Sequence, residues 1–155
     1  MYAAAMLHDI GRYVNPSAHH KHSAYLVRHS AMEGWRPENI DLLAAIVRYH
    51  RKALPKPAHI EWAALIPADR TRVERLAALL RLADGLDRRR MGVVGAVSVV
   101  RKDGEIEIVA RSTQTMQPEI EAVLHKADLF ERAFGLRLRA RAESVRVEGE
   151  VVPIG

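Results

Sequence analysis

The spacing of apolar residues changes twice along this chain, and this change constrains the fold more than any other feature. Up to about residue 90 they recur every three or four positions, which is the spacing of one buried helix face. Over 93–109 they alternate at every second position around the turn residues Asp103 and Gly104, as in a β-hairpin. Helical spacing returns over 118–134. The sequence therefore predicts a mainly α fold, a helical bundle followed by a small β-β-α-β unit.

Breaks that contain proline or glycine divide these segments into individual elements. The expected helices of the first part cover residues 2–13, 19–32, 38–51 and 70–90. The second part is expected to hold strands over 93–100 and 105–109, a helix over 118–134, a strand over 136–140 and a last strand over 144–152. The change of spacing predicts a helical domain over 1–91 and a C-terminal α+β subdomain over 92–155.

The first predicted helix starts without a capping residue and is rich in alanine from its third position. A natural domain rarely begins inside a helix, so we expect this N-terminus to lie within a larger fold. The 155 residues are the length of one domain, with room for a small appendage.

The chain contains no cysteine, which excludes disulfides, thiolate metal sites and cysteine nucleophiles. A metal ion would therefore have to be held by His, Asp or Glu. No apolar run reaches the ~18 residues that a membrane span needs, and no signal peptide opens the sequence. We expect a cytoplasmic protein without membrane contacts.

The formal net charge is +5, and the sequence pI is about 9.9. Two interpretations fit this charge: an arginine-rich composition without functional cause, or an anionic partner such as a phosphate chain, a nucleotide or a nucleic acid. Aromatic residues make up only 5% of the chain, so stacking platforms for single strands are not expected. Nucleic acid is therefore a disfavoured partner, and phosphate groups are the expected point of contact.

Several polar residues fall where the helical pattern predicts burial. His8 and Asp9 are adjacent in the first predicted helix, and Asp84 continues the apolar stripe of the fourth. His22 shares a face with apolar neighbours, and His50 closes the stripe of the third helix. Each residue alone is explained by a surface position, a core histidine or a structural ion pair. Together they offer nitrogen and carboxylate ligands from several helices, which is how bundles hold divalent metals without cysteine.

Five basic residues lie close in sequence to these histidines: Arg12, Lys21, Arg48, Arg51 and Lys52. Solvated helix faces account for such charges in most proteins. Their concentration around the candidate ligands fits phosphate binding, because Arg and Lys side chains pair well with oxyanions. We interpret the arginine run 88–90 instead as a cap on the negative end of the fourth helix.

Five segments, in order, resemble signature blocks in the C-terminal region of the exopolyphosphatase and guanosine pentaphosphate phosphohydrolase (Ppx/GppA) family. They are 7–11 (LHDIG), 19–26 (HHKHSAYL), 47–52 (VRYHRK), 80–88 (LRLADGLDR) and 126–131 (KADLFE). The adjacent His-Asp pair followed by a distant Asp also resembles the HD superfamily, in which these groups and an upstream His converge in a helical bundle.

The resemblance implies a metal site formed by His8, Asp9 and Asp84, with His22 and His50 available for a second ion. Mn, Mg, Fe, Co and Zn all accept such ligands. It also implies polyphosphate or guanosine polyphosphate as the ligand, and a homodimer. Two features of the pattern have no counterpart here: the upstream His would precede residue 1, and the family's ATPase-like catalytic domains are absent. No catalytic residue is assigned.

Three hypotheses follow. The leading one is an accessory domain of a polyphosphate-handling phosphatase, which binds the phosphate ligand and supports dimerisation. The alternative is a self-sufficient metal-dependent HD phosphohydrolase that acts on a nucleotide or another phosphate ester. The third is a structural or interaction module without metal. The sequence leaves open whether this segment alone is an enzyme.

Overall fold

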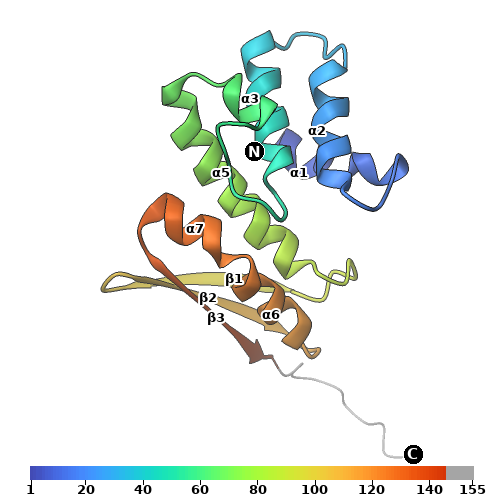
Figure 1. Ribbon diagram of the computed structural model, residues 1–155. Helices are drawn as coiled ribbons and strands as arrows, with labels where there is room; N and C mark the ends of the chain where they lie inside the picture. Colours follow the sequence, from blue (N-terminus) through green and yellow to red (C-terminus); the bar gives the residue numbers. More distant parts are fainter. Residues whose placement is uncertain (146–155) are drawn as a thin grey trace, which may run out of the picture.

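The computed structural model describes residues 1–145 and confirms the predicted mainly helical fold with a small α+β unit (Figure 1). The bundle elements are α1 (Tyr2–Leu7), the 3₁₀ helix η1 (Ile10–Tyr13), α2 (His19–His29), α3 (Pro37–Arg48), α4 (Ile60–Ala63) and α5 (Pro67–Leu86). The second part consists of β1 (Ala96–Lys102), β2 (Glu105–Ser112), α6 (Gln117–His125), α7 (Ala127–Phe134) and β3 (Arg137–Ser144). Among residues 1–145, none of the helices combines the length and the apolar character that a membrane crossing requires.

Two predicted helices are each divided in the structure. The first breaks at Asp9, whose φ of −105° and ψ of 0° leave the helical region. The helix expected over 118–134 breaks at Lys126, with φ −103° and ψ 6°. Apolar spacing continues across both breaks, so it could not reveal them. The four-residue helix α4 is also too short for a periodic signal, and most of the strand predicted over 144–152 lies outside the described residues.

The sheet has the order β1-β2-β3. β1 and β2 pair antiparallel with Lys102 opposite Glu105, whereas β2 and β3 pair parallel with Glu105 opposite Arg137. A parallel pair needs a crossover connection, and α6 with α7 provides it. Both helices lie on the face of the sheet that is turned toward α5 (Figure 1). On the other face, ion pairs such as Arg139 with Glu105 join neighbouring strands.

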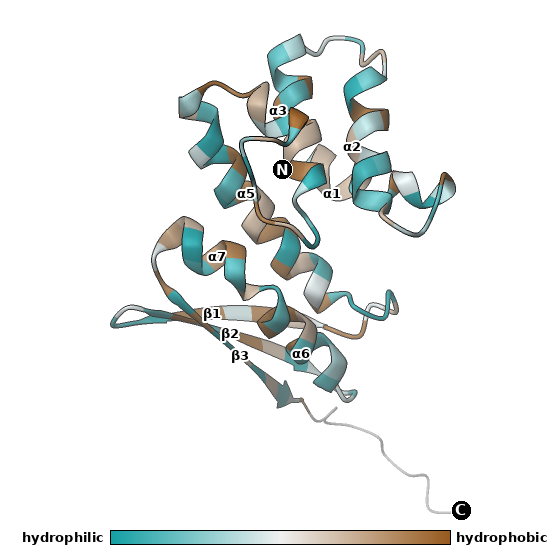
Figure 2. Cartoon of the chain, in the orientation of Figure 1, coloured by the Kyte–Doolittle hydropathy of each residue, from teal (hydrophilic) through white to brown (hydrophobic). Residues whose placement is uncertain are grey.

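One buried apolar cluster connects the bundle with the α+β unit. It includes Ala45 and Val47 of α3, Leu80 of α5, Val123 of α6 and Leu129 of α7. Figure 2 shows α5 changing from mostly polar at its start to mostly apolar where it passes α7. Because α5 packs against both parts, it fixes the bundle's polar residues relative to α6 and α7.

Gly11 allows η1 to pack closely against α2. A Cβ atom at this position would lie 2.3 Å from the His19 carbonyl oxygen and 2.3 Å from the Ser23 amide nitrogen. The Gly11 N–H also donates to Ser23 Oγ at 2.8 Å. The backbone atoms cannot retreat as a flexible side chain could, so the contact tolerates no larger residue.

We therefore expect Gly11→Ala to lower the free energy of unfolding by about 3 kcal/mol in a urea titration, because backbone must move to admit the methyl group. Gly95→Ala is the matched control, since its nearest contact would be an ordinary 3.5 Å from the Arg111 carbonyl oxygen. Equal effects of the two substitutions would contradict the close approach of η1 to α2.

Candidate functional site

Three metal-ligand side chains from different elements converge beside α1. Asp9 lies between α1 and η1, His19 begins α2, and His50 follows α3. Asp9 Oδ1 lies 3.0 Å from His19 Nε2 and 3.9 Å from His50 Nε2, and the two Nε2 atoms are 3.3 Å apart. Each of the three residues offers a ligand atom within 4.8 Å of the others. We call these three residues the His–Asp cluster.

Backbone carbonyl groups orient the imidazoles. His50 Nδ1 donates to the carbonyl oxygen three residues earlier at 2.6 Å, and His8 Nδ1 does the same at 2.7 Å. His19 Nδ1 lies 3.1 Å from the corresponding carbonyl oxygen and 3.2 Å from Arg51 Nη1. In His8 and His50, donation from Nδ1 leaves the Nε2 lone pair free, which is the arrangement that metal-binding histidines use. In His19, Nδ1 either donates to the carbonyl oxygen or accepts from Arg51, because a guanidinium only donates.

Burial keeps the cluster histidines neutral. His50 is fully buried, and His19 is 2% exposed. Burial lowers the pKa of His50 to about 3 and also lowers the pKa of His19. Neutral imidazole is the protonation state that binds metal, so no proton has to leave these rings at neutral pH.

Asp84 lies next to the cluster, where two basic side chains already neutralise it. Lys126 Nζ donates to Asp84 Oδ2, and Arg90 Nη2 lies 3.4 Å from Oδ1. His8 Nε2 is 3.8 Å from the same Oδ1, and Arg90 also pairs with Asp9. Burial by itself raises the pKa of Asp84, but His8 and Lys126 outweigh it and hold this pKa well below its usual range.

His8 responds in the opposite direction. Burial by itself lowers its pKa, but the Asp84 carboxylate, the backbone carbonyl group and Asp9 together raise it above the ordinary value. The site thus contains two kinds of histidine: the deeply buried, neutral pair of the cluster, and His8 between two carboxylates.

The donor set fits a divalent metal ion. Two neutral imidazoles and one carboxylate are a common ligand set for Zn, Mn, Fe or Co. The His8 Nε2 atom and both buried Asp9 oxygens lack a hydrogen bond of good geometry among residues 1–145, although Asp9 is ion-paired with Arg90 and lies beside His19. Such atoms are costly to bury unless a cation or water satisfies them. Asp9, His19 and His50 would hold the ion, with His8 and Asp84 beside it.

The structure brings together four of the five predicted ligands, His8, Asp9, His50 and Asp84, but not His22. The His22 side chain is half-buried on α2, where its Cβ faces Gly11. His19, three residues earlier on the same helix, lies at the ligand position that the sequence analysis assigned to His22. The run His19-His20-Lys21-His22 was the available signal, but it did not tell which histidine points inward.

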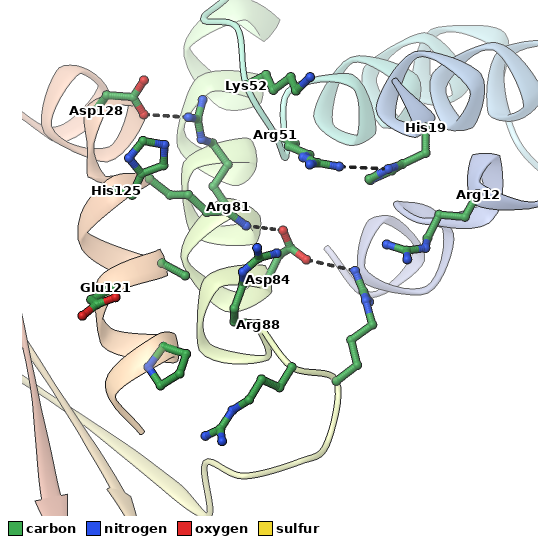
Figure 3. Close-up of a pocket in the computed structure, with 15 residues that line it drawn as sticks. Arg12, His19, Arg51, Lys52, Arg81, Asp84, Arg88, Glu121, His125 and Asp128 are labelled. Atoms are coloured by element: carbon green, nitrogen blue, oxygen red, sulfur yellow. Dashed lines mark hydrogen bonds and ion pairs between the residues drawn. The ribbon is translucent and has the colours of Figure 1, made fainter. Parts of the chain in front are cut away.

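A basic cleft lies between the bundle and α6, with a cavity volume of about 1040 Å³. In Figure 3, Arg12 and His19 project from the bundle side, while Glu121 and His125 belong to α6 across the cleft. Eight Arg and Lys residues line it, against three acidic ones. The basic residues are Arg12, Arg51, Lys52, Arg81, Arg88, Arg89, Arg90 and Lys126, and the acidic residues are Asp84, Glu121 and Asp128.

Three of the five basic residues predicted to bind phosphate, Arg12, Arg51 and Lys52, line this cleft. Lys21 is exposed on α2 and is not among the lining residues. Arg48 is buried, and its Nε lies 3.7 Å from a Glu61 carboxylate oxygen. The arginine run 88–90, interpreted from sequence as a helix cap, lines the cleft together with residues of α6.

Backbone strain is concentrated around the same site. The non-glycine residues with positive φ in the described chain are Ala18 (55°), Lys52 (62°) and Arg90 (56°). Ala18 directly precedes His19, and the other two line the basic cleft. Such conformations cost about 1–2 kcal/mol each and occur preferentially at functional sites.

A buried ion pair anchors α6 to the end of α5 at the cleft. The Glu119 carboxylate, 1% exposed, accepts hydrogen bonds from Arg89 Nε at 2.9 Å and Nη2 at 2.7 Å. These bonds outweigh the effect of burial and hold the pKa of Glu119 below its ordinary value. The pair thereby stabilises the fold above the unfolded pKa, about 4.3 for Glu, and this contribution is lost as the pH falls through the folded pKa.

We expect Glu119→Gln to lower the free energy of unfolding by roughly 1–2 kcal/mol at pH 7, because a charge-assisted pair is lost. Its stability should then decline less steeply than that of the original protein below about pH 4.3. Urea titrations at pH 7 and at acidic pH measure both effects, with Glu121→Gln as an exposed control on the same helix. If the free energy of unfolding of Glu119→Gln fell with acidic pH as steeply as that of the original protein, the role of the pair would be contradicted.

A helical bundle brings a His-Asp pair, further histidines and a distant Asp together beside a basic cleft, the arrangement that the sequence resemblance implied. The family model described as "Ppx/GppA phosphatase, domain III" matches residues 1–131. The chain belongs to this family, as the sequence resemblance predicted.

Two curated relatives are similar to part of the chain. Both are named "Guanosine-5'-triphosphate,3'-diphosphate pyrophosphatase", from Pseudoalteromonas translucida (strain TAC 125) and from Pseudoalteromonas atlantica (strain T6c / ATCC BAA-1087). They are 35% and 37% identical over 54 residues, which is 35% of this chain. The match covers 11% of each relative's length.

Proposed function

We propose that this domain binds polyphosphate or a guanosine polyphosphate in the basic cleft, as an accessory domain of a phosphohydrolase. The observation that carries the proposal is the excess of eight basic over three acidic residues around one open cavity. Two relatives named for a guanosine pentaphosphate-type substrate support the ligand class. Arg forks and Lys ammonium groups are well suited to phosphate oxygens.

The arrangement of the basic residues favours an extended anion. Arg12 lies in η1, Arg51 and Lys52 follow α3, Arg88 follows α5 and Lys126 follows α6. Basic groups on separate elements can contact successive phosphates along one chain. They also repel one another in the free protein, which an anionic ligand relieves.

The test is a titration of the domain with a defined short polyphosphate at several salt concentrations. If about three basic side chains contact phosphates, the affinity should fall roughly 20- to 40-fold between 50 and 200 mM salt, because bound counterions are released. No detectable binding at low salt, or an affinity independent of salt, would contradict the proposal.

The proposal extends to a homodimer, which the family resemblance implies. Light scattering of the purified domain measures its mass directly. A monomeric mass at all accessible concentrations would contradict the proposed homodimer. Binding of phosphate in the cleft does not depend on it.

The His–Asp cluster favours a second function, that of a metal-dependent phosphohydrolase. When bound, a divalent ion supplies Lewis-acid polarisation of a phosphoryl oxygen and lowers the pKa of a bound water. Asp9, His19 and His50 would hold the ion, and Arg12 and Arg51 would orient the phosphoryl group and stabilise its negative charge. If neither metal nor phosphate binds, these polar groups form a structural network, which is the third hypothesis.

A further inference from the structure

Arg81 is a deeply buried basic residue at the basic cleft that the sequence did not single out. Its side chain is 3% exposed, although α5 carries it into the cleft lining (Figure 3). Arg81 Nη2 donates to Asp128 Oδ1 at 2.7 Å. The buried Nε and Nη1 atoms have no hydrogen-bond partner among the described residues.

One carboxylate therefore satisfies only part of this guanidinium. A guanidinium offers five N–H donors, and buried donors without acceptors are destabilising. Burial lowers the pKa of Arg81 despite Asp128, which indicates incomplete compensation of its charge. The neighbouring Lys126 adds to the imbalance, since its charge repels Arg81 while its own hydrogen bond goes to Asp84.

Asp128 is placed differently from Arg81. Its side chain is 47% exposed and comes from α7, on the opposite side of the cleft from the bundle. The carboxylate reaches into the cleft from solvent, and its Oδ1 also accepts the Leu129 N–H at 2.8 Å. It therefore occupies the position that an anion entering the cleft would take.

We propose that Arg81 anchors a phosphate subsite in the basic cleft, where the Asp128 carboxylate stands in for a phosphoryl group. An entering phosphate displaces Asp128 from Nη2, and its several oxygens accept more of the guanidinium donors than one carboxylate does. Lys126 and Arg51 line the same cleft. This inference rests on the proposed phosphate-binding function and adds the residue that anchors the anion.

The decisive experiment compares Asp128→Asn with Glu121→Gln by calorimetric titration with inorganic phosphate at constant ionic strength. Each variant removes one acidic cleft residue, so the net charge changes equally. Only Asp128 pairs with Arg81, whereas Glu121 accepts a hydrogen bond from Gln117. We expect Asp128→Asn to tighten phosphate binding about fivefold, the effect of removing one partly exposed competing charge, and Glu121→Gln to change it less than twofold.

Equal affinities in the two variants would overturn the subsite while leaving the proposed function of the cleft in place. Absence of phosphate and short-polyphosphate binding in the original protein would overturn both. Parallel titrations with inorganic phosphate and with the short polyphosphate distinguish the source of the group. If Asp128→Asn binds both inorganic phosphate and the short polyphosphate more tightly, the subsite accepts the end of a phosphate chain as well as the free ion. If only the affinity for inorganic phosphate rises, the subsite belongs to the free ion.

Arg81→Gln provides a second measurement that is independent of the Asp128→Asn result. If the variant folds, as judged by circular dichroism, its phosphate affinity should fall at least tenfold and the gain from Asp128→Asn should disappear in the double variant. Persistence of the gain without Arg81 would overturn the proposal.

Discussion

Replacing His19 with glutamine is expected to weaken divalent-metal binding by about 100-fold or more. Loss of groups that merely orient metal ligands already costs about 10–100-fold, so loss of a ligand itself should exceed that range. His19 Nε2 lies 3.0 Å from Asp9 and 3.3 Å from His50 Nε2, at the centre of the donor set. Titration with Zn or Mn, followed by calorimetry and by elemental analysis after dialysis, measures the change.

His22→Gln is the matched control for this experiment. It removes an imidazole from the same helix, three residues away, without touching the His–Asp cluster. Metal affinity should remain within about twofold of the original, and both variants should keep their helical circular dichroism. The reverse order, with His22 essential and His19 dispensable, would show that the sequence-based ligand set was the better one.

Reversing two charges of the basic cleft should weaken polyphosphate binding by about 100-fold. Arg51→Glu and Arg88→Glu change residues that follow α3 and α5, respectively, and both residues line the cleft. Neither residue forms an ion pair within residues 1–145. Each reversal replaces a favourable contact with a repulsive one, worth roughly tenfold at a partly exposed position. The slope of affinity against salt concentration should also become shallower, because fewer counterions are released.

The control for the double reversal is Arg36→Glu combined with Arg72→Glu. Arg36 directly precedes α3, and Arg72 lies in the first half of α5. Both residues are exposed, and neither lines the cleft. The net charge changes by the same amount, so any difference between the two double variants reports the location of the charge. Equal losses would mean that the ligand responds to overall charge and that the cleft has no special role.

The sequence by itself determined the fold class. The switch from helical spacing to alternation and back reports which faces are buried, and burial of one face is what stabilises each element. The same logic indicated that His8, Asp9, His50 and Asp84 were unusual, because polar groups at predicted core positions need partners. It could not divide the helices at Asp9 and Lys126, where the apolar spacing continues through a change in backbone direction.

Only the tertiary structure decided which histidine joins the cluster and which basic residues share the cleft. Residues three apart lie on the same side of a helix, so the choice between His19 and His22 depends on how α2 is placed and rotated against α3. Arg88 and Lys126 line one cleft because α5 packs against α6 and α7, a contact between segments far apart in sequence. The sequence encodes which groups need partners, but the packing of whole elements fixes which partners they find.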